Sequence, residues 1–494
     1  MNSALYIGAT GMKGLGAGMN VITHNLANVS TIGYKEQDVQ FSDLIYPEQG
    51  GIGRWWGAQE NSYVAIGQAG KGVRVDTVRT LFGQGALESS NTVTDLAIAG
   101  KGFFQVTDGT RTYYTRAGDF RNDKEGVFRT PQGMALNGYR LQPDGSPGGL
   151  EPVTVPRYSP MPAKATSSLD MRLNLGLDTQ HSLDPANPYF SLLGQFNATG
   201  TPPLAPSAYG YAQGIDLYDS GGNARTATIY FDAAPDATPG STAQYLIALA
   251  PEKEGTSAQA LMAGTLSFNV QGQLTSMSAF VPSAGDSLLP ADWIPAMLSA
   301  DGLPQMEAMG STVSVNLGIR ALGGWVNPPA NAGAVGTDQS LLPSMGTNAE
   351  RSADATANYT GAPTLRYGMQ DGYSEGILSR IHIHTDGIVT GFYSNNRSMD
   401  LWQIPLCRFT SEDGLRREGD NLFSATPAAG VMGMGTPGTE NYGTVRSYNI
   451  EQSNVDMAAE MVDMIITQRG FQSNSKVVTT ADQMLQRAVE LKRS

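Results

Sequence analysis

Residues 457–485 read MAAEMVDMIITQRGFQSNSKVVTTADQML, and apolar side chains recur in this stretch every seven residues. The first thirty residues show a related pattern, in which apolar or small residues follow one another at alternating steps of three and four. Such heptad spacing is typical of helices that pack along a seam. We therefore predict a helix at each end of the chain, and we expect the two to pair with each other or with neighbouring copies. The predicted assembly interface comprises Leu5, Met12, Leu15, Met19, Ile22, Leu26, Met464, Phe471, Val478 and Leu485.

Glycines interrupt the first predicted helix at positions 8, 11, 14, 16 and 18. Each glycine inside a helix costs roughly 1 kcal/mol of helix stability relative to alanine. We therefore expect this helix to fold only when it packs against partners, and its small residues would let those partners approach closely. The segment Tyr6–Gly14, YIGATGMKG, also looks like a dinucleotide-binding loop. However, too few residues precede it for a strand, and the apolar stripe continues through it. A Rossmann-type oxidoreductase therefore remains only as an alternative, as an enzyme and not an assembly subunit.

The composition indicates a β-rich chain with many turns. Its 494 residues include 59 glycines and only 16% charged residues. A formal charge of −13 argues against nucleic acid, which requires concentrated Lys and Arg, and against an anionic membrane surface. The single cysteine, Cys407, excludes an internal disulfide framework and is expected to be a small core residue. No apolar run is long enough to span a bilayer, and the N-terminus does not resemble a signal peptide.

Short alternating segments between the ends predict half-buried strands, with Pro- and Gly-rich loops between them. Examples are Ala227–Phe231, Leu266–Val270 and Val313–Leu317, and a hairpin is expected at Thr385–Gly387. We divide the chain into a helical domain (1–30 with 454–494), a connector (31–70) and a first β domain (71–156 with 366–446). An inserted outer β domain, with room for a sub-domain, would span 157–365.

Candidate catalytic groups are sparse. The pair His382 and His384 would project from one strand face and could place two imidazoles on a metal, but no Cys or acidic cluster completes the site. We interpret the pair as an exposed polar face, and we predict no catalytic, cofactor or metal site. His24, on the first helix, could make a helix contact sensitive to pH.

Four ordered blocks of sequence resemble the bacterial flagellar rod and hook proteins. The first is Asn25–Asn28 (NLAN) with Thr31–Lys35 (TIGYK), although His24 stands where the family usually has Asn. The second is 95–104 with 115–120, and the third runs from 386 to 423. The fourth is 451–456 with 461–471. The motif residues carried over are Asn25, Asn28, Thr31, Gly33, Tyr34, Lys35, Gln452, Asn454, Asp456, Gln468 and Arg469.

The resemblance implies a mainly β fold with helical termini that pair as a coiled-coil-like inner layer around nested, discontinuous β domains. Rod members are shorter, so the middle insert implies a hook subunit, with a rod-type subunit carrying an unusual insert as the alternative. Such a subunit polymerises into a curved tube that transmits torque, and it is a structural protein, not an enzyme. The implied partners are copies of itself, the distal rod, the hook cap, the hook–filament junction proteins and the flagellar type III export apparatus. The implied location is the extracellular flagellum.

We also expect polar Gln468, Ser475 and Asp482 on the last helix to face a wet channel.

Overall fold

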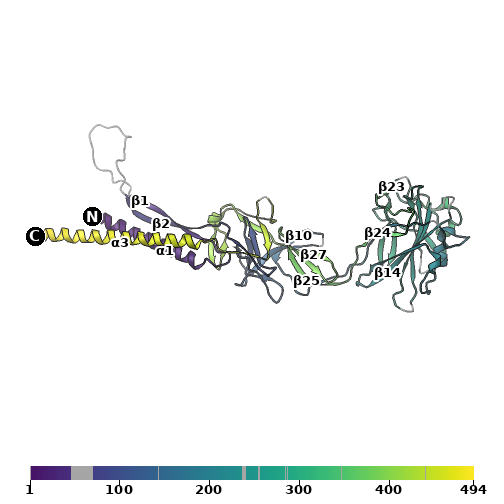
Figure 1. Cartoon of the computed structure of the whole chain (residues 1–494), viewed down its shortest axis with the longest axis horizontal. Coiled ribbons are helices and arrows are strands. Elements are labelled where there is room, and N and C mark those ends of the chain that lie inside the picture. The colour runs from purple at the N-terminus through teal and green to yellow at the C-terminus, as the bar shows by residue number, and fades with distance from the viewer. Residues whose placement is uncertain are drawn as a thin grey trace, which may run out of the picture. The chain divides into compact units, whose positions relative to one another are not determined.

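The computed structural model describes residues 2–45, 70–142, 144–177, 179–235, 241–253, 256–283, 285, 287–346, 348–439 and 441–493 (Figure 1). The chain forms two compact units. Unit 1 comprises Met1–Ser159 and Leu378–Ser494, and unit 2 comprises Pro160–Ile377. The described segments are mostly strands, with a long helix near each terminus. The predicted fold class, mainly β with helical termini and a nested insert, is confirmed.

Unit 1 holds helices α1 (Asn2–Ala27) and α3 (Met457–Arg493), which lie side by side and antiparallel (Figure 1). Tyr6–Gly14 therefore lies within α1, and no strand among the described residues precedes it, so the dinucleotide-loop alternative is wrong. Asp456 accepts hydrogen bonds from the backbone at the start of α3, so this helix begins at Met457, slightly later than expected. No helix among the described residues is long and apolar enough to cross a membrane.

A two-stranded ribbon packs beside α1. Strand β1 (Gln37–Ile45) pairs antiparallel with β2 (Gly70–Thr80), and both contact the helix. The sequence predicted a connector over 31–70, whereas residues 37–45 form a strand with a defined partner. The part of that prediction covering 46–69 lies outside the described residues.

The β part of unit 1 is a sheet in which β25, β26, β27, β9, β5, β6, β30 and β29 are neighbours in that order. The predicted hairpin joins β25 to β26, and Gly387 has the positive φ of 84° that a tight turn favours in glycine. The remaining bounds are β3 Leu87–Ser89, β4 Leu96–Ala99, β5 Phe104–Thr107, β6 Thr112–Thr115, β7 Arg121–Asn122, β8 Phe128–Arg129, β9 Ala135–Leu141, β10 Pro147–Pro152, β25 Gly376–Ile383, β26 Ile388–Tyr393, β27 Ser398–Gln403, β28 Leu406–Phe409, β29 Arg416–Gly419, β30 Leu422–Ser424, β31 Met432–Gly435, β32 Thr444–Ser447 and β33 Asn449–Glu451.

Unit 2 contains a seven-stranded sheet and a four-stranded sheet. The first has the order β13, β14, β15, β16, β18, β19, with β17 beside β16, and the second has the order β20, β21, β12, β24. Its strands are β11 Pro160–Met161, β12 Ser168–Asn174, β13 Tyr211–Tyr218, β14 Ala224–Ala233, β15 Thr242–Leu249, β16 Gln259–Phe268, β17 Leu274–Met277, β18 Phe280–Pro282, β19 Trp293–Pro295, β20 Gln305–Ala308, β21 Ser311–Asn316, β22 Ile319–Ala321, β23 Ala349–Arg351 and β24 Thr364–Gln370, with a short helix α2 at Ser191–Gln195.

The alternation that predicted strands in unit 2 marks its core. Side chains at 227, 229, 231, 313, 315 and 317 are all buried. Val270 is instead 88% exposed, because β16 ends at Phe268 and the chain turns there. The expected insert ended at 365, but β24 pairs along its length with β12, so the compact unit continues to Ile377.

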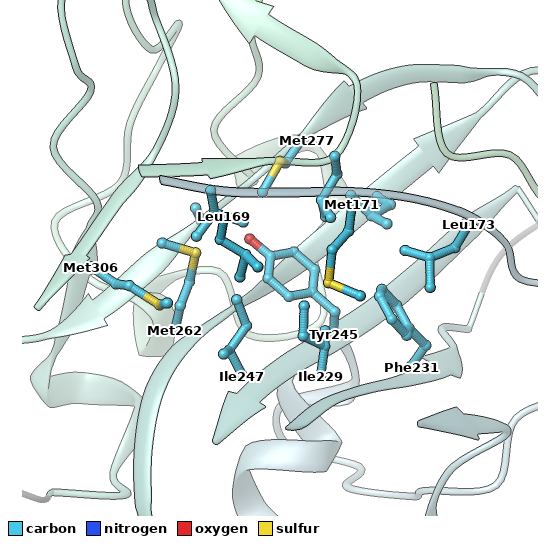
Figure 2. Packing of buried hydrophobic residues seen from close by; sticks show 14 of the residues in the cluster. Leu169, Met171, Leu173, Ile229, Phe231, Tyr245, Ile247, Met262, Met277 and Met306 are labelled. Atoms are coloured by element: carbon cyan, nitrogen blue, oxygen red, sulfur yellow. The ribbon is translucent and has the colours of Figure 1, made fainter. Parts of the chain in front are cut away.

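The larger core of unit 2 is rich in methionine. Figure 2 shows the Tyr245 ring among the side chains of Met171, Met262, Met277 and Met306. The Tyr245 hydroxyl donates to the Ser278 carbonyl at 2.9 Å, so the one polar atom of this ring is satisfied. Complete burial raises the pKa of Tyr245 well above its ordinary value.

Candidate assembly site

Helix α1 is packed between α3 and the β1–β2 ribbon, and its glycines permit both approaches. A Cβ added to Gly8 would lie 2.7 Å from Val478 Cγ2, and one added to Gly11 would lie 2.9 Å from Asn474 Nδ2. On the other side, a Cβ at Gly14 would lie 3.3 Å from Val73 Cγ1. Any larger residue at Gly8 or Gly11 would force neighbouring atoms to move. Gly8, Gly11 and Gly14 thus serve close packing, as expected from the sequence, whereas a Cβ added to Gly16 would meet no atom within 4 Å.

Nine of the ten residues predicted as the assembly interface are half-buried within one chain, and the tenth is exposed. Those of α1 that were predicted as interface (5, 12, 15, 19, 22 and 26) are half-buried, as are Met464, Val478 and Leu485 of α3. Phe471 is 40% exposed. Since α1 and α3 contact each other, much of this stripe is used inside the chain. Its role between chains stays a prediction.

Of the three polar residues of α3 predicted to face a wet channel, two are exposed, and the channel itself stays a prediction. Thr467, Asn474 and Ala481 are half-buried, whereas Gln468 and Asp482 are exposed. A step of three from Met464 leads to Thr467, and a step of four leads to Gln468, which an α-helix places further round its axis. Gln468 and Asp482 therefore point away from α1. Ser475, also predicted to be polar-facing, is half-buried.

Asn25 joins three segments at the end of α1. Its Nδ2 donates to the Gln37 carbonyl at 2.8 Å and to Glu460 Oε1 at 2.7 Å. Its Oδ1 accepts from the Gln37 amide and from the Tyr34 hydroxyl, both at 3.0 Å. The side chain is 1% exposed. One fully used amide thus links α1 to the start of β1 and to α3.

The turn after α1 is built by the next motif residues. Asn28 Nδ2 donates to the His24 carbonyl at 2.8 Å, and the Thr31 hydroxyl donates to Asn28 Oδ1 at 3.1 Å. Gly33 has a φ of 68°, and an added Cβ would lie 2.5 Å from the Ala117 nitrogen. Both the backbone angle and the space therefore require glycine. His24 Nδ1 lies 2.8 Å from the hydroxyl of Tyr34, a residue of the turn after α1, so its expected pH-sensitive role at a helix contact stays a prediction.

A buried ionic cluster lies directly beyond this turn. Lys35 Nζ is 2.6 Å from Glu451 Oε1, and Arg116 Nη1 is 3.3 Å from Glu451 Oε2. None of the three side chains is more than 2% exposed. Lys35 Nζ also donates to the Gly83 carbonyl at 2.7 Å, and the Gly85 amide donates to Glu451 Oε1 at 3.0 Å. Burial lowers the pKa of Lys35, and the Glu451 charge opposes this shift.

The residues before α3 complete the same region. Asn454 Oδ1 accepts from the Glu36 amide at 2.7 Å, and its Nδ2 donates to the Leu81 carbonyl at 2.9 Å. Gln452 Nε2 donates to Glu88 Oε2 at 2.5 Å. Asp456 Oδ1 accepts from the amides of residues 458 and 459, which caps α3.

We call this region, from Asn25 to Glu36 with Arg116 and Glu451–Glu460, the polar joint. It gathers nine of the eleven predicted motif residues. Gln468 and Arg469 lie further along α3, are exposed and take no part in it. Glu451 and Arg116 lie inside the quoted sequence blocks but were not predicted as site residues. A charged residue whose partner lies hundreds of positions away leaves no periodic signal in the sequence.

The surroundings of two carboxyl groups at the joint disfavour their ionised forms. Burial raises the pKa of Glu460, and the hydrogen bond from Asn25 opposes this. Burial also raises the pKa of Glu36, with the nearby charges of Glu460 and Asp38 adding to the effect. The joint is therefore expected to be less stable when these groups are ionised.

The remaining candidates have ordinary environments. The rings of His382 and His384 are 4.6 Å apart, and the described residues hold no cluster of three or more His, Cys, Asp or Glu able to bind a metal. Cys407 is fully buried, and burial raises its pKa to about 12, so its expected role as a core residue is confirmed. The polar joint, in contrast, links α1 and α3 to the β core of unit 1 through buried hydrogen bonds and ion pairs.

Comparisons with known proteins agree with this architecture. The model "Flagellar hook protein FlgE/F/G D1 domain" matches residues 97–169, "Flagellar basal body protein FlaE D2 domain" matches 191–373, and "Flagellar basal body rod FlgEFG protein C-terminal" matches 446–491. The flagellar hook protein FlgE of Borreliella burgdorferi is 29% identical over 499 residues, covering 100% of both chains. Along its whole length, the chain is similar to flagellar hook proteins.

A second hook protein matches along almost the whole length of this chain. The flagellar hook protein FlgE of Salmonella typhimurium is 29% identical over 497 residues, with 98% of each chain covered. The crystal structure of the Helicobacter pylori flagellar hook protein FlgE2 has 13% sequence identity and a TM-score of 0.47, covering 74% of this chain and 100% of that one. The alignments with the Borreliella burgdorferi and Salmonella typhimurium proteins include the insert, which the sequence alone could not assign to any named domain.

Proposed function

We propose that this chain is the structural subunit of a flagellar hook and polymerises into a curved tube. The observation that carries the proposal is the end-to-end similarity to hook proteins, insert included. The polar joint supports it, because a tube subunit needs its two terminal helices held in a fixed direction relative to the β core.

The proposed mechanism assigns different mechanical tasks to different parts of the chain. The α1–α3 pair and the β1–β2 ribbon would form the inner wall, where packing against neighbours must stay sealed. The β domains would form the outer contacts, which slide as the tube bends while it transmits torque from rod to filament. Packed helices resist extension, whereas contacts between polar domain surfaces can exchange at small free-energy cost.

The proposed partners follow from this role. They are other copies of the chain, the distal rod, the hook cap and the hook–filament junction proteins. We further propose export through the flagellar type III apparatus without a cleaved signal peptide, and an extracellular location in the flagellum. A rod-type subunit is the less favoured alternative, because the alignments with hook proteins extend through the middle insert.

Deletion of residues 1–30 tests the proposal. The shortened chain should stay monomeric where the full chain forms tubes, as judged by sedimentation and electron microscopy. The control is Val270→Ser, which replaces an exposed apolar side chain in a turn of unit 2 and should leave assembly unchanged. If the full-length protein, seeded with hook fragments, forms no tubes, the proposed function is wrong.

Limited proteolysis adds a second readout for the same protein. The sequence alone would predict that dilute monomer loses both ends and leaves a core of about residues 71–445. Because Lys35 and Glu451 are buried in the polar joint, we expect protease to remove only the part of α1 before Asn25, which carries the five glycines, and the part of α3 after Glu460. Protected termini in dilute monomer would show that the helices fold before they assemble.

A further inference from the structure

An apolar patch on the start of α3 has no partner among the described residues. Met461, Val462, Ile465 and Ile466 are 49%, 55%, 50% and 61% exposed, although all four lie in one short stretch of helix. Half-buried Met464 and Thr467 face α1, so the patch lies on the opposite side of α3. Beyond it this face becomes polar, with Arg469 and Gln472. Four exposed aliphatic side chains gathered on one helix face are typical of an interaction surface.

The predicted heptad stripe does not account for this patch. That stripe is already half-buried against α1 within one chain, so a neighbouring copy needs another surface on α3. We propose that the patch receives the start of α1, at Tyr6 and Ile7, from a second copy of this chain. This inference rests on the proposed function and names the surface through which copies would join.

The start of α1 has matching exposure. Tyr6 and Ile7 are 54% and 39% exposed, at the end of α1 that lies away from the joint. Gly8 lies against Val478, and Gly470 lies against Leu15, so residues 6 and 7 are level with about residue 478 of their own α3. The patch is about 14 residues away, or roughly 20 Å along the axis at 1.5 Å per residue. One chain cannot bring the two surfaces together.

A second copy displaced along the helix axis by roughly 20 Å would bring them level. In that position its Lys13, one heptad beyond Tyr6 on the exposed face of α1, would come level with Asp456 at the start of α3. Lys13 and Asp456 are both exposed and carry opposite charges. The contact joins two unlike surfaces, so repeating it generates an open helical assembly rather than a closed dimer.

Cysteine cross-linking tests the pairing directly. Chains carrying Ile7→Cys and chains carrying Ile465→Cys would be mixed, polymerised on hook fragments and treated with a mild thiol oxidant such as diamide. We expect cross-linked dimers containing one chain of each kind in the polymer and none in dilute monomer. The native Cys407 is fully buried and does not compete. Val270→Cys mixed with Ile465→Cys is the matched control and should give no dimers.

A different cross-linking result is expected if another surface covers the patch. If Ile465→Cys cross-links to Phe41→Cys of another chain and not to Ile7→Cys, the patch holds the β1–β2 ribbon and the proposed pairing is wrong. Absence of any cross-link in tubes formed by these variants also overturns it.

Polar substitution separates the inference from the proposed function. In Ile465→Ser with Ile466→Ser, the concentration needed for assembly should rise roughly tenfold or more, because exposed apolar area is no longer buried between copies. The monomer should keep its wild-type circular dichroism, since both side chains are exposed. If this variant assembles like wild type, the inference fails while the proposed function stands. If wild type itself does not assemble, the proposed function fails.

Discussion

The ionic cluster of the polar joint and the core of unit 2 are both buried, but they are held by opposite chemistry. At the joint, Lys35, Arg116 and Glu451 are almost completely inaccessible and interact through charge. In unit 2, the Tyr245 ring is surrounded by methionine and aliphatic side chains (Figure 2). Apolar burial stabilises without specifying direction, whereas a hydrogen-bonded ionic cluster is satisfied in few arrangements. We infer that the joint uses polar contacts because the direction of its helices matters.

The same contrast explains the different tolerance expected of the two regions. Methionine has three flexible torsions and adapts to small changes of shape, so the core of unit 2 can be repacked. A buried charge that loses its partner cannot be compensated by repacking. The following predictions test this difference, in order of decreasing effect.

The largest effect is expected for Glu451→Gln. The substitution leaves Lys35 and Arg116 buried without a counter-charge, which should destabilise unit 1 by about 3–5 kcal/mol. Calorimetry would follow the unfolding transitions of the two units, and that of unit 2 should not move. Glu350→Gln is the control, since its ion pair with Arg320 is solvent-exposed and should change stability by less than about 1 kcal/mol. A loss as small as the control's would contradict the role given to the cluster.

In unit 2, Ile229→Ala should cost about 3 kcal/mol because it leaves a cavity in a fully buried site. The conservative Met262→Leu should cost less than about 1.5 kcal/mol, since the volume is nearly kept. Urea unfolding of each variant measures the two values. If Met262→Leu lost as much stability as Ile229→Ala, this core would tolerate changes of side-chain shape as poorly as the joint is expected to.

Asn25→Ala should destabilise the joint by about 1–3 kcal/mol, because Glu460 loses its buried hydrogen bond and the Gln37 backbone loses two. Asn20→Ala, at an exposed position on the same helix, provides the comparison and should be neutral or slightly stabilising. Calorimetry of unit 1 distinguishes the two. Similar behaviour of both variants would show that Asn25 acts only through helix propensity.

The smallest effect is expected from pH. Burial raises the pKa of Glu36 in the folded protein above its ordinary value of 4.5. The resulting stability is therefore fully present below the unfolded-state pKa and is lost as pH rises through the folded-state pKa. Glu36→Gln should stabilise unit 1 at neutral pH by less than about 1 kcal/mol, given partial screening, and the gain should vanish near pH 4. A gain that is unchanged by pH would rule out ionisation as its cause.

The helices and the motif residues of the joint could be predicted because their signals are local. Heptad spacing located α1 and α3, and the resemblance named Asn25 and Lys35. Their partners could not be predicted, because Glu460 and Glu451 are separated from them by 435 and 416 positions. The end of the insert was misplaced for the same reason, since β24 is defined by pairing with the distant β12.

The most direct test of the account is immunogold electron microscopy of whole flagella, with antibody raised against unit 2, residues 160–377. We predict label on the short curved segment between the cell surface and the filament. Label confined to the basal rod would contradict the hook assignment in favour of a rod-type subunit, and label found only in the cytoplasm would contradict assembly altogether.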